Sequence, residues 1–255
     1  MRPSMEQLNY ARKGSGFPLV LVHGYLGGAK LWDRQVAALK SDFDVIAPNL
    51  PGFADSASLR APDTIGGFAD RVLALLDDLG IERFHLLGHS MGGMIVQHMA
   101  AHAPDRISRL VCYGTGPVGM LPERFETIEQ SRNRLKHDGL EAAVRRIAAT
   151  WFVDGESARS YPICVTVGER ASMQAALACL SAWEKWDGRE ALASVSADTL
   201  IIWGDRDRSY GRSEQETLLR GIRRSERAIV PGCAHNVHME EPELFNRIVR
   251  DFLIR

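Results

Sequence analysis

Short apolar runs alternate along the chain with longer segments in which apolar residues recur every three or four positions. The short runs predict buried strands, because a strand covered on both faces has no polar face. The spaced segments predict amphipathic helices. Strands are expected at 18–23, 43–47, 84–87, 107–113, 199–203 and 228–230. Helices are expected at 31–39, 64–79, 91–103 and 244–253.

This alternation predicts an α/β fold with a mostly parallel, doubly wound sheet covered by helices on both faces. The alternation stops between residues 117 and 188, where only helical patterns occur, most clearly at 121–136, 140–152 and 173–186. A helical block inserted between two strands is expected to cover the carboxyl edge of the sheet, where such sheets bind ligands. We therefore expect a core formed by residues 1–116 and 189–255, with a helical cap at 117–188.

The segment Gly88-His89-Ser90-Met91-Gly92 reads G-x-S-x-G and lies between a predicted strand and a predicted helix. In that context the pattern is typical of a nucleophile elbow, a sharp turn that presents the serine hydroxyl clear of its own backbone. The helix that follows directs its N-terminal amides at the point where negative charge would develop. Ser90 is the predicted nucleophile.

A serine nucleophile needs a base and a carboxylate that orients the base. His235 is the predicted base, because it lies between the last short strand and the last helix, at the sheet edge where the elbow opens. Asp205 and Asp207 both follow the strand at 199–203, whereas the loop after the preceding strand carries no acid. The carboxylate is therefore expected within 204–208, and the chain order Ser, Asp, His is that of elbow-type hydrolases.

These motifs together resemble the α/β-hydrolase superfamily, in its capped branch with a serine nucleophile. The matching segments are His23-Gly24-Tyr25, Leu50-Pro51-Gly52-Phe53, the elbow around Ser90, Trp203-Gly204-Asp205-Arg206-Asp207, and His235 with the acidic Glu240–Glu243 stretch behind it. The resemblance extends to small esterases, enol-lactonases and C–C bond hydrolases. It implies the α/β-hydrolase fold, Asp207 rather than Asp205 as the orienting acid, and the backbone N–H groups of Tyr25 and Met91 as an oxyanion hole.

Charge and composition exclude several classes of partner. With 31 basic and 32 acidic residues the formal net charge is −1, which argues against nucleic acid or an anionic membrane. No apolar run approaches the ~20 residues of a membrane span. The four cysteines have no paired spacing, which predicts free thiols in a reducing cytoplasm. Neither a metal nor an organic cofactor is expected, since a triad needs none, and homo-oligomer formation stays open.

The sequence therefore predicts a serine hydrolase that acts on a small-molecule carboxylic ester or lactone through an acyl-enzyme on Ser90. A C–C bond hydrolase using the same triad, for a β-diketone or vinylogous substrate, is the first alternative. A ligand-binding receptor with little turnover is an alternative of another class. Candidate residues for a substrate pocket are Tyr25, Trp151, Trp183 and Trp186.

Overall fold

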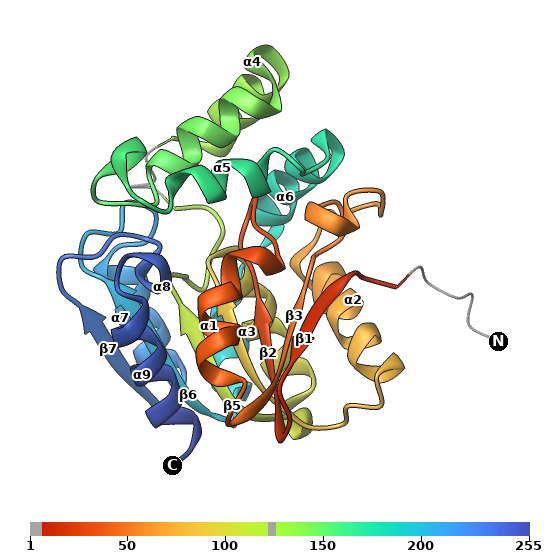
Figure 1. Ribbon diagram of the computed structural model, residues 1–255, viewed down its shortest axis with the longest axis vertical. Helices are drawn as coiled ribbons and strands as arrows, with labels where there is room; N and C mark the ends of the chain where they lie inside the picture. The colour runs from red at the N-terminus through yellow and green to blue at the C-terminus, as the bar shows by residue number, and fades with distance from the viewer. Residues whose placement is uncertain (1–6, 122–125) are drawn as a thin grey trace.

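The computed structural model describes residues 7–121 and 126–255. In this part of the chain seven strands form one sheet, in the order β1-β3-β2-β4-β5-β6-β7 (Figure 1). Strand β1 runs antiparallel to β3, and the other neighbours are parallel. The strands are β1 (Tyr10–Lys13), β2 (Phe17–Val22), β3 (Phe43–Pro48), β4 (Phe84–His89), β5 (Ile107–Tyr113), β6 (Asp198–Gly204) and β7 (Ser225–Val230).

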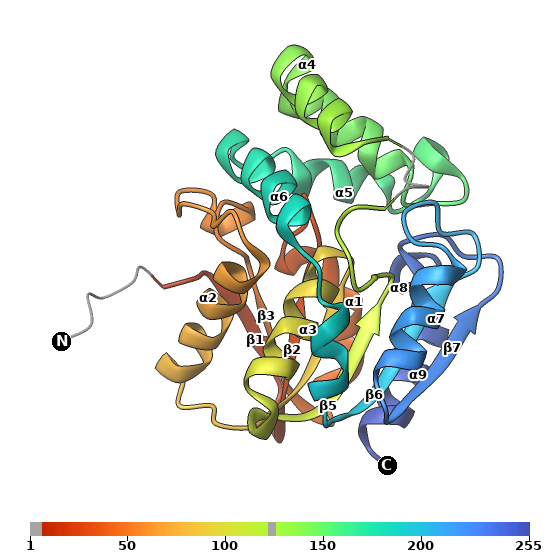
Figure 2. The ribbon, with the colours of Figure 1, turned by 180° about the vertical axis from the view of Figure 1, so that it is seen from behind.

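Helices cover both faces of the sheet (Figures 1 and 2). One face carries α1 (Asp33–Leu39), α8 (Val237–Glu240) and α9 (Pro242–Leu253), and the other carries α2 (Ile65–Asp78), α3 (Met91–His102) and α7 (Arg212–Gly221). Short 3-10 helices lie at Ala29–Trp32, Ala54–Ser56, Pro104–Arg106, Gly155–Ser157 and Arg189–Ser194. None of the described helices is both long enough and apolar enough to cross a membrane.

The hydrophobic core is divided by the sheet into two clusters. Alternate residues of β2 enter opposite clusters, with Val20 and Val22 on the α2 and α3 side and Leu19 and Leu21 on the α1 and α9 side. This alternation follows from the two-residue period of a strand. It explains why the central strands appear in the sequence as continuous apolar runs: all six residues of β4 are buried.

Between β5 and β6 the chain leaves the sheet and forms α4 (Ile128–Ala149), α5 (Tyr161–Gly168) and α6 (Met173–Lys185). These helices lie above the carboxyl ends of the strands (Figures 1 and 2). The two ends of the insertion pair with each other through a bridge between Val118 and Asp187, and Gly188 N–H donates to Pro117 O at 2.8 Å. The fold class is the predicted one, while the cap boundaries at 117 and 188 stay a prediction.

Helix α4 bends at Gly139, whose φ of 84° is outside the helical range. Glycine adopts this backbone conformation without strain. The bend lies between the predicted helices at 121–136 and 140–152. Residues 122–125 of the first predicted helix lie outside the described residues, and α4 begins at Ile128. The two predictions therefore correspond to one kinked helix.

Candidate active site

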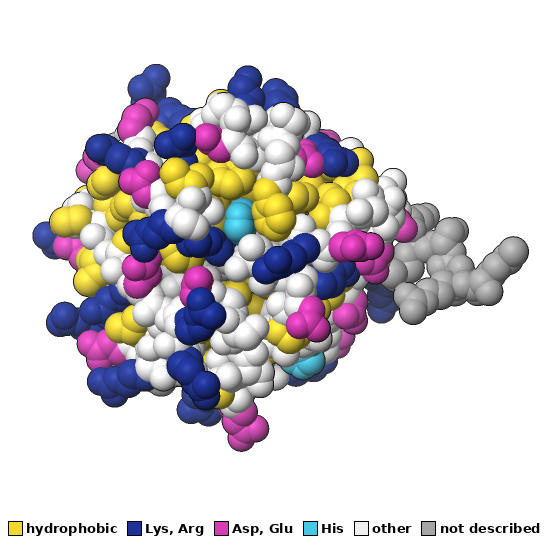
Figure 3. Space-filling model, turned by 90° about the horizontal axis from the view of Figure 1, so that it is seen from below, with side chains coloured by type: hydrophobic (Ala, Val, Ile, Leu, Met, Phe, Trp, Pro, Cys, Tyr) yellow, Lys and Arg dark blue, Asp and Glu magenta, His cyan; other side chains and the backbone are white. Residues whose placement is uncertain are grey.

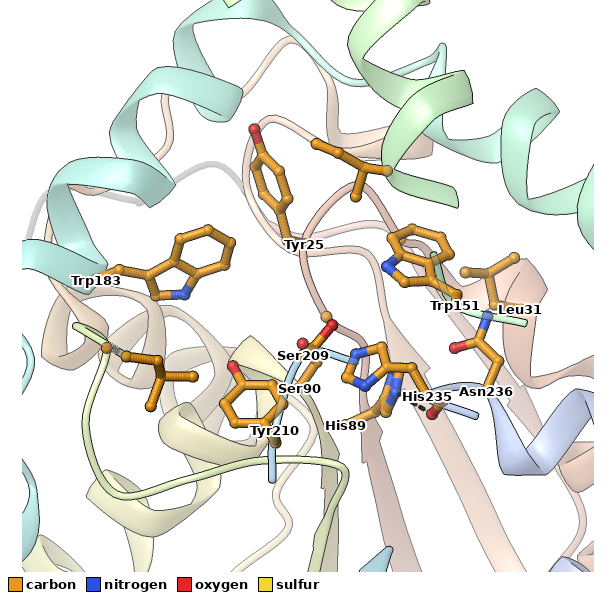
Figure 4. A pocket seen from close by; sticks show the side chains of 15 residues that line it. Tyr25, Leu31, His89, Ser90, Trp151, Trp183, Ser209, Tyr210, His235 and Asn236 are labelled. Atoms are coloured by element: carbon orange, nitrogen blue, oxygen red, sulfur yellow. Dashed lines mark hydrogen bonds between the residues drawn. The ribbon is translucent and has the colours of Figure 1, made fainter. Parts of the chain in front are cut away.

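Ser90 occupies the turn between β4 and α3, with φ 57° and ψ −120°. This is a backbone conformation that side-chain-bearing residues rarely adopt, and it persists because the surroundings hold it. Ser90 N–H donates to Tyr113 O at 2.9 Å, and the Thr115 hydroxyl donates to Ser90 O at 2.7 Å. The Ser90 side chain makes no capping bond to α3, and it faces the pocket above the sheet (Figure 4).

The serine turn and the chain at the end of β2 lie so close together that side chains would collide there. A Cβ at Gly92 would lie 2.3 Å from Val22 O, and a Cβ at Gly24 would lie 2.9 Å from Ser90 Cβ. Both positions therefore require glycine. The consequence is that the loop after β2, which contains Gly24 and Tyr25, lies directly beside Ser90.

His235 and Asp207 form a buried pair. His235 Nδ1 lies 2.8 Å from Asp207 Oδ2, and their side chains are 2% and 0% exposed. The other carboxylate oxygen of Asp207 accepts the N–H groups of Ser209 at 2.7 Å and Tyr210 at 3.2 Å. Because the carboxylate can only accept, Nδ1 carries the proton and Nε2 is left to act as the base.

Asp205, the other acid of this loop, has a different partner. Its Oδ1 accepts Gly232 N–H at 2.7 Å, which ties the loop after β6 to the loop after β7. The structure thus brings Asp207, and not Asp205, to His235. Figure 4 shows His235 and Ser90 side by side on the floor of the pocket.

Two uncharged aromatic side chains, of Tyr113 and His89, form hydrogen bonds to the main chain of His235. Its carbonyl oxygen accepts the Tyr113 hydroxyl at 2.9 Å and the Nε2–H of His89 at 3.1 Å. Burial lowers the pKa of His89 well below its usual range and lowers the pKa of His238 to about 3. Burial also raises the pKa of Tyr113. These groups are therefore uncharged at neutral pH, and Tyr113 and His89 fix the main chain of His235.

The two amides predicted to form an oxyanion hole belong to Tyr25 and to Met91, the first residue of α3. His23 fixes the loop that carries Tyr25: its Nδ1–H donates to Gly24 O at 2.7 Å, and its Nε2 accepts Leu50 N–H at 2.9 Å. Burial lowers the pKa of His23 to about 4. His23 is thus a neutral brace for this loop, and the role of the two amides stays a prediction.

Three of the four predicted pocket residues line the pocket over Ser90: Tyr25, Trp151 and Trp183 (Figure 4). The Tyr25 ring lies 4.9 Å from the Trp183 ring, and its hydroxyl donates to Ala176 O in α6 at 3.3 Å. The side chain of Tyr25 therefore packs against the helical insertion.

Trp186, the fourth candidate, lies elsewhere. Helix α6 ends at Lys185, and Trp186 continues with extended backbone angles of −86° and 117°. Its ring consequently leaves the pocket-facing side of the helix, packs over Gly188 and lies 5.9 Å from the ring of His98. Helical spacing could not show this, because it assumes that the helix continues through residue 186.

The pocket also contains residues that sequence reasoning did not select, among them Leu31, Ile147, Tyr210 and Asn236. The space not filled by atoms, counted out to the open mouth with its solvent, is about 600 Å³. A signal existed for Asn236 and Tyr210, since one follows His235 directly and the other is three residues after Asp207. The sequence offers no such signal for Leu31 and Ile147, because the spacing of these apolar residues fits a position in the hydrophobic core equally well.

Comparison with known proteins places this geometry in a family. Residues 18–154 match the family model described as alpha/beta hydrolase fold. The chain belongs to the α/β-hydrolase family. Among the described residues of this α/β-hydrolase, no three His, Cys, Asp or Glu side chains are grouped so that they could hold a metal ion.

Relatives of this α/β-hydrolase match over nearly its whole length. It is 30% identical to a 2-hydroxy-6-oxononadienedioate/2-hydroxy-6-oxononatrienedioate hydrolase from Burkholderia vietnamiensis, over 98% of this chain and 91% of the relative. A thermophilic esterase from Thermogutta terrifontis superposes with a TM-score of 0.86 at 25% identity, covering 96% and 92% of the two chains. An enol-lactonase from Burkholderia xenovorans gives 0.89 at 23% identity, covering 97% and 96%, a likeness of fold alone.

Proposed function

We propose that this α/β-hydrolase cleaves a small carboxylic ester or lactone through an acyl-enzyme on Ser90. The observation that carries the proposal is the buried His235–Asp207 pair, 2.8 Å apart, beside a serine held on a strained turn. In the first step Ser90 Oγ attacks the carbonyl carbon while His235 Nε2 takes its proton. Asp207 holds the ring and stabilises the imidazolium that forms.

The later steps use the same groups. The tetrahedral oxyanion is held by the N–H groups of Tyr25 and Met91, and loss of one such donor typically costs about 10²–10³ in turnover. His235 then gives its proton to the departing alkoxide. A water molecule deprotonated by His235 attacks the acyl-enzyme and releases the acid, which returns Ser90 to its starting state.

A C–C bond hydrolase on the same triad is the second candidate, favoured by the relative from Burkholderia vietnamiensis and its name. That name denotes a substrate with two carboxylates. Among the described residues that line the pocket, none is lysine or arginine. Burying a carboxylate without a cationic partner costs free energy. The lining of this pocket therefore favours an uncharged ester or lactone over a dianionic substrate.

The proposal includes a cytoplasmic enzyme with a small-molecule substrate and no nucleic-acid or membrane partner, and with residues 117–188 as its cap. The net charge of −1 supports the absence of polyanion binding. Seen from below, basic and acidic side chains are interspersed over the surface (Figure 3). All four cysteines are buried and unpaired, which fits a reducing compartment.

Ser90→Ala tests the proposal directly. We expect its turnover of p-nitrophenyl butyrate to fall by about 10⁴ or more, because the nucleophile is lost. A serine-reactive phosphonate should label the wild-type chain at Ser90. Ser209→Ala, a change of the same size in the same pocket, is the matched control and should stay within about tenfold of wild type. Near-wild-type hydrolysis by Ser90→Ala would overturn the assignment, and tight ligand binding without turnover would favour a receptor.

A further inference from the structure

Asn236 places a carboxamide on the wall of the active-site pocket, next to His235 (Figure 4). The residue is 1% exposed, and its Oδ1 is a buried acceptor without a hydrogen-bond partner among the described residues. Leaving such an acceptor unpaired lowers the stability of the folded chain. Native structures pair nearly all buried polar groups, so this oxygen requires an explanation.

The loop does not need this side chain for its own structure. The main chain of Asn236 is already held, because its N–H donates to Trp151 O at 3.0 Å and its carbonyl accepts Met239 N–H at 2.8 Å. Backbone hydrogen bonds therefore hold the loop at Asn236 without help from the carboxamide. Its surroundings on the pocket wall are apolar, with Trp151 and Leu31 nearby (Figure 4).

Two sulfur atoms determine which way the carboxamide faces. The Cys164 thiol donates to Met239 Sδ at 3.5 Å, so both sulfurs remain as weak acceptors. Asn236 Nδ2 lies against them, 3.6 Å from Cys164 Sγ and 3.7 Å from Met239 Sδ. This arrangement uses the amide hydrogens on the sulfur side and turns Oδ1 toward the pocket (Figure 4).

We infer that Asn236 is a specificity-determining residue whose Oδ1 accepts a hydrogen bond from a hydroxyl or N–H group of the substrate. This inference rests on the proposed function, and it narrows the substrate to an uncharged ester or lactone that carries such a donor near the scissile carbonyl. A substrate without the donor would leave the oxygen unpaired in the complex, and sites of this kind reject such analogues.

The test compares matched esters in wild type and Asn236→Leu, a substitution of similar size and shape. Methyl mandelate and methyl phenylacetate differ by a hydroxyl on the acyl side. 2-Hydroxyethyl phenylacetate and propyl phenylacetate differ by a hydroxyl in place of a methyl on the alcohol side. The readout is the ratio of kcat/KM within each pair. An ester that is not turned over is scored by its inhibition constant against p-nitrophenyl butyrate hydrolysis.

We expect wild type to favour the hydroxyl-bearing member of at least one pair, and the preference to fall by about tenfold or more in Asn236→Leu. The melting temperature of Asn236→Leu should be unchanged or higher, because an unpaired buried acceptor has been removed. Asn236→Ala should lose the same preference and serves if the leucine variant does not fold.

Equal ratios in wild type and variant for both pairs would overturn the inference. That outcome is distinct from failure of the proposed function, which would appear as hydrolysis of the same esters by Ser90→Ala. Ser90-dependent hydrolysis with unchanged ratios would leave the serine mechanism in place and remove the role assigned to Asn236.

Discussion

At the scale of single residues, the proposed chemistry depends on which of two nearby acids reaches His235. The sequence predicted the serine and the histidine from their motifs, but the residues alone left Asp205 and Asp207 open, and only resemblance favoured the second. The reason is geometric: two positions in one turn differ in direction, and spacing does not show direction. Asp207 points to His235, whereas Asp205 binds Gly232 N–H.

Asp207→Asn should lower kcat/KM for p-nitrophenyl butyrate by about 10³ or more, because a carboxamide no longer fixes the productive tautomer of His235. Asp205→Asn is the matched control. It keeps an oxygen for Gly232 N–H and should remain within about tenfold of wild type. Similar losses in the two variants would contradict the assignment of the orienting acid.

At the scale of elements, the loop that carries His235 is tied to the chain that follows α4. Glu240, at the end of α8, accepts Val153 N–H with one oxygen at 2.8 Å and Ala234 N–H with the other at 2.7 Å. Asn236 N–H donates to Trp151 O. The main chain on both sides of His235 is therefore bonded, directly or through Glu240, to the helical insertion.

Glu240→Ala should lower the free energy of unfolding by about 1–3 kcal/mol, because the buried Ala234 N–H loses its acceptor. The same variant should reduce kcat/KM, since the histidine loop loses one of its ties. Chemical denaturation and p-nitrophenyl butyrate kinetics measure the two effects. Glu241→Ala removes an exposed neighbour and should change neither. If the two variants behave alike, Glu240 does not hold the loop.

Most elements with regular apolar patterns were predicted, whereas the short apolar helix α5 and two polar elements were missed. Every expected strand is present, with ends that differ by at most three residues. Strand β1 (YARK) was missed because it is a short edge strand with only half-buried or exposed residues. Helix α7 was missed because only two of its ten residues, Gln215 and Leu218, are buried, and only one of these is apolar. In both cases few side chains are buried, so the element leaves only a weak apolar pattern in the sequence.

At the scale of the whole molecule, several histidines are buried as neutral rings. Burial lowers the pKa of His23 and His85 to about 4 and of His238 to about 3. In the unfolded chain these rings take up a proton near pH 6.5. Between about pH 6.5 and 4 the unfolded state therefore binds more protons than the folded state. The contribution of these histidines to the free energy of unfolding is complete above this window, and it is lost as the pH drops through the window.

Denaturant unfolding at pH 7.5 and 4.5 should show this loss, at up to about 1.4 kcal/mol per pH unit for each such histidine. His85→Leu should reduce the loss. His85 packs between Phe17 and Phe43, and its Nδ1 has no hydrogen-bond partner among the described residues, so the substitution removes one titrating ring without breaking a bond. An unchanged difference between the two pH values would contradict this account.

The order of the groups along the chain has a consequence for synthesis. Ser90 comes before the helical insertion, and Asp207 and His235 come after it. In the proposed mechanism, a chain synthesised only through β6 would lack His235 and so would have no imidazole to activate Ser90. The proposed triad is complete only when β7 lies beside β6 in the sheet and the loop that follows β7 carries His235 to Asp207.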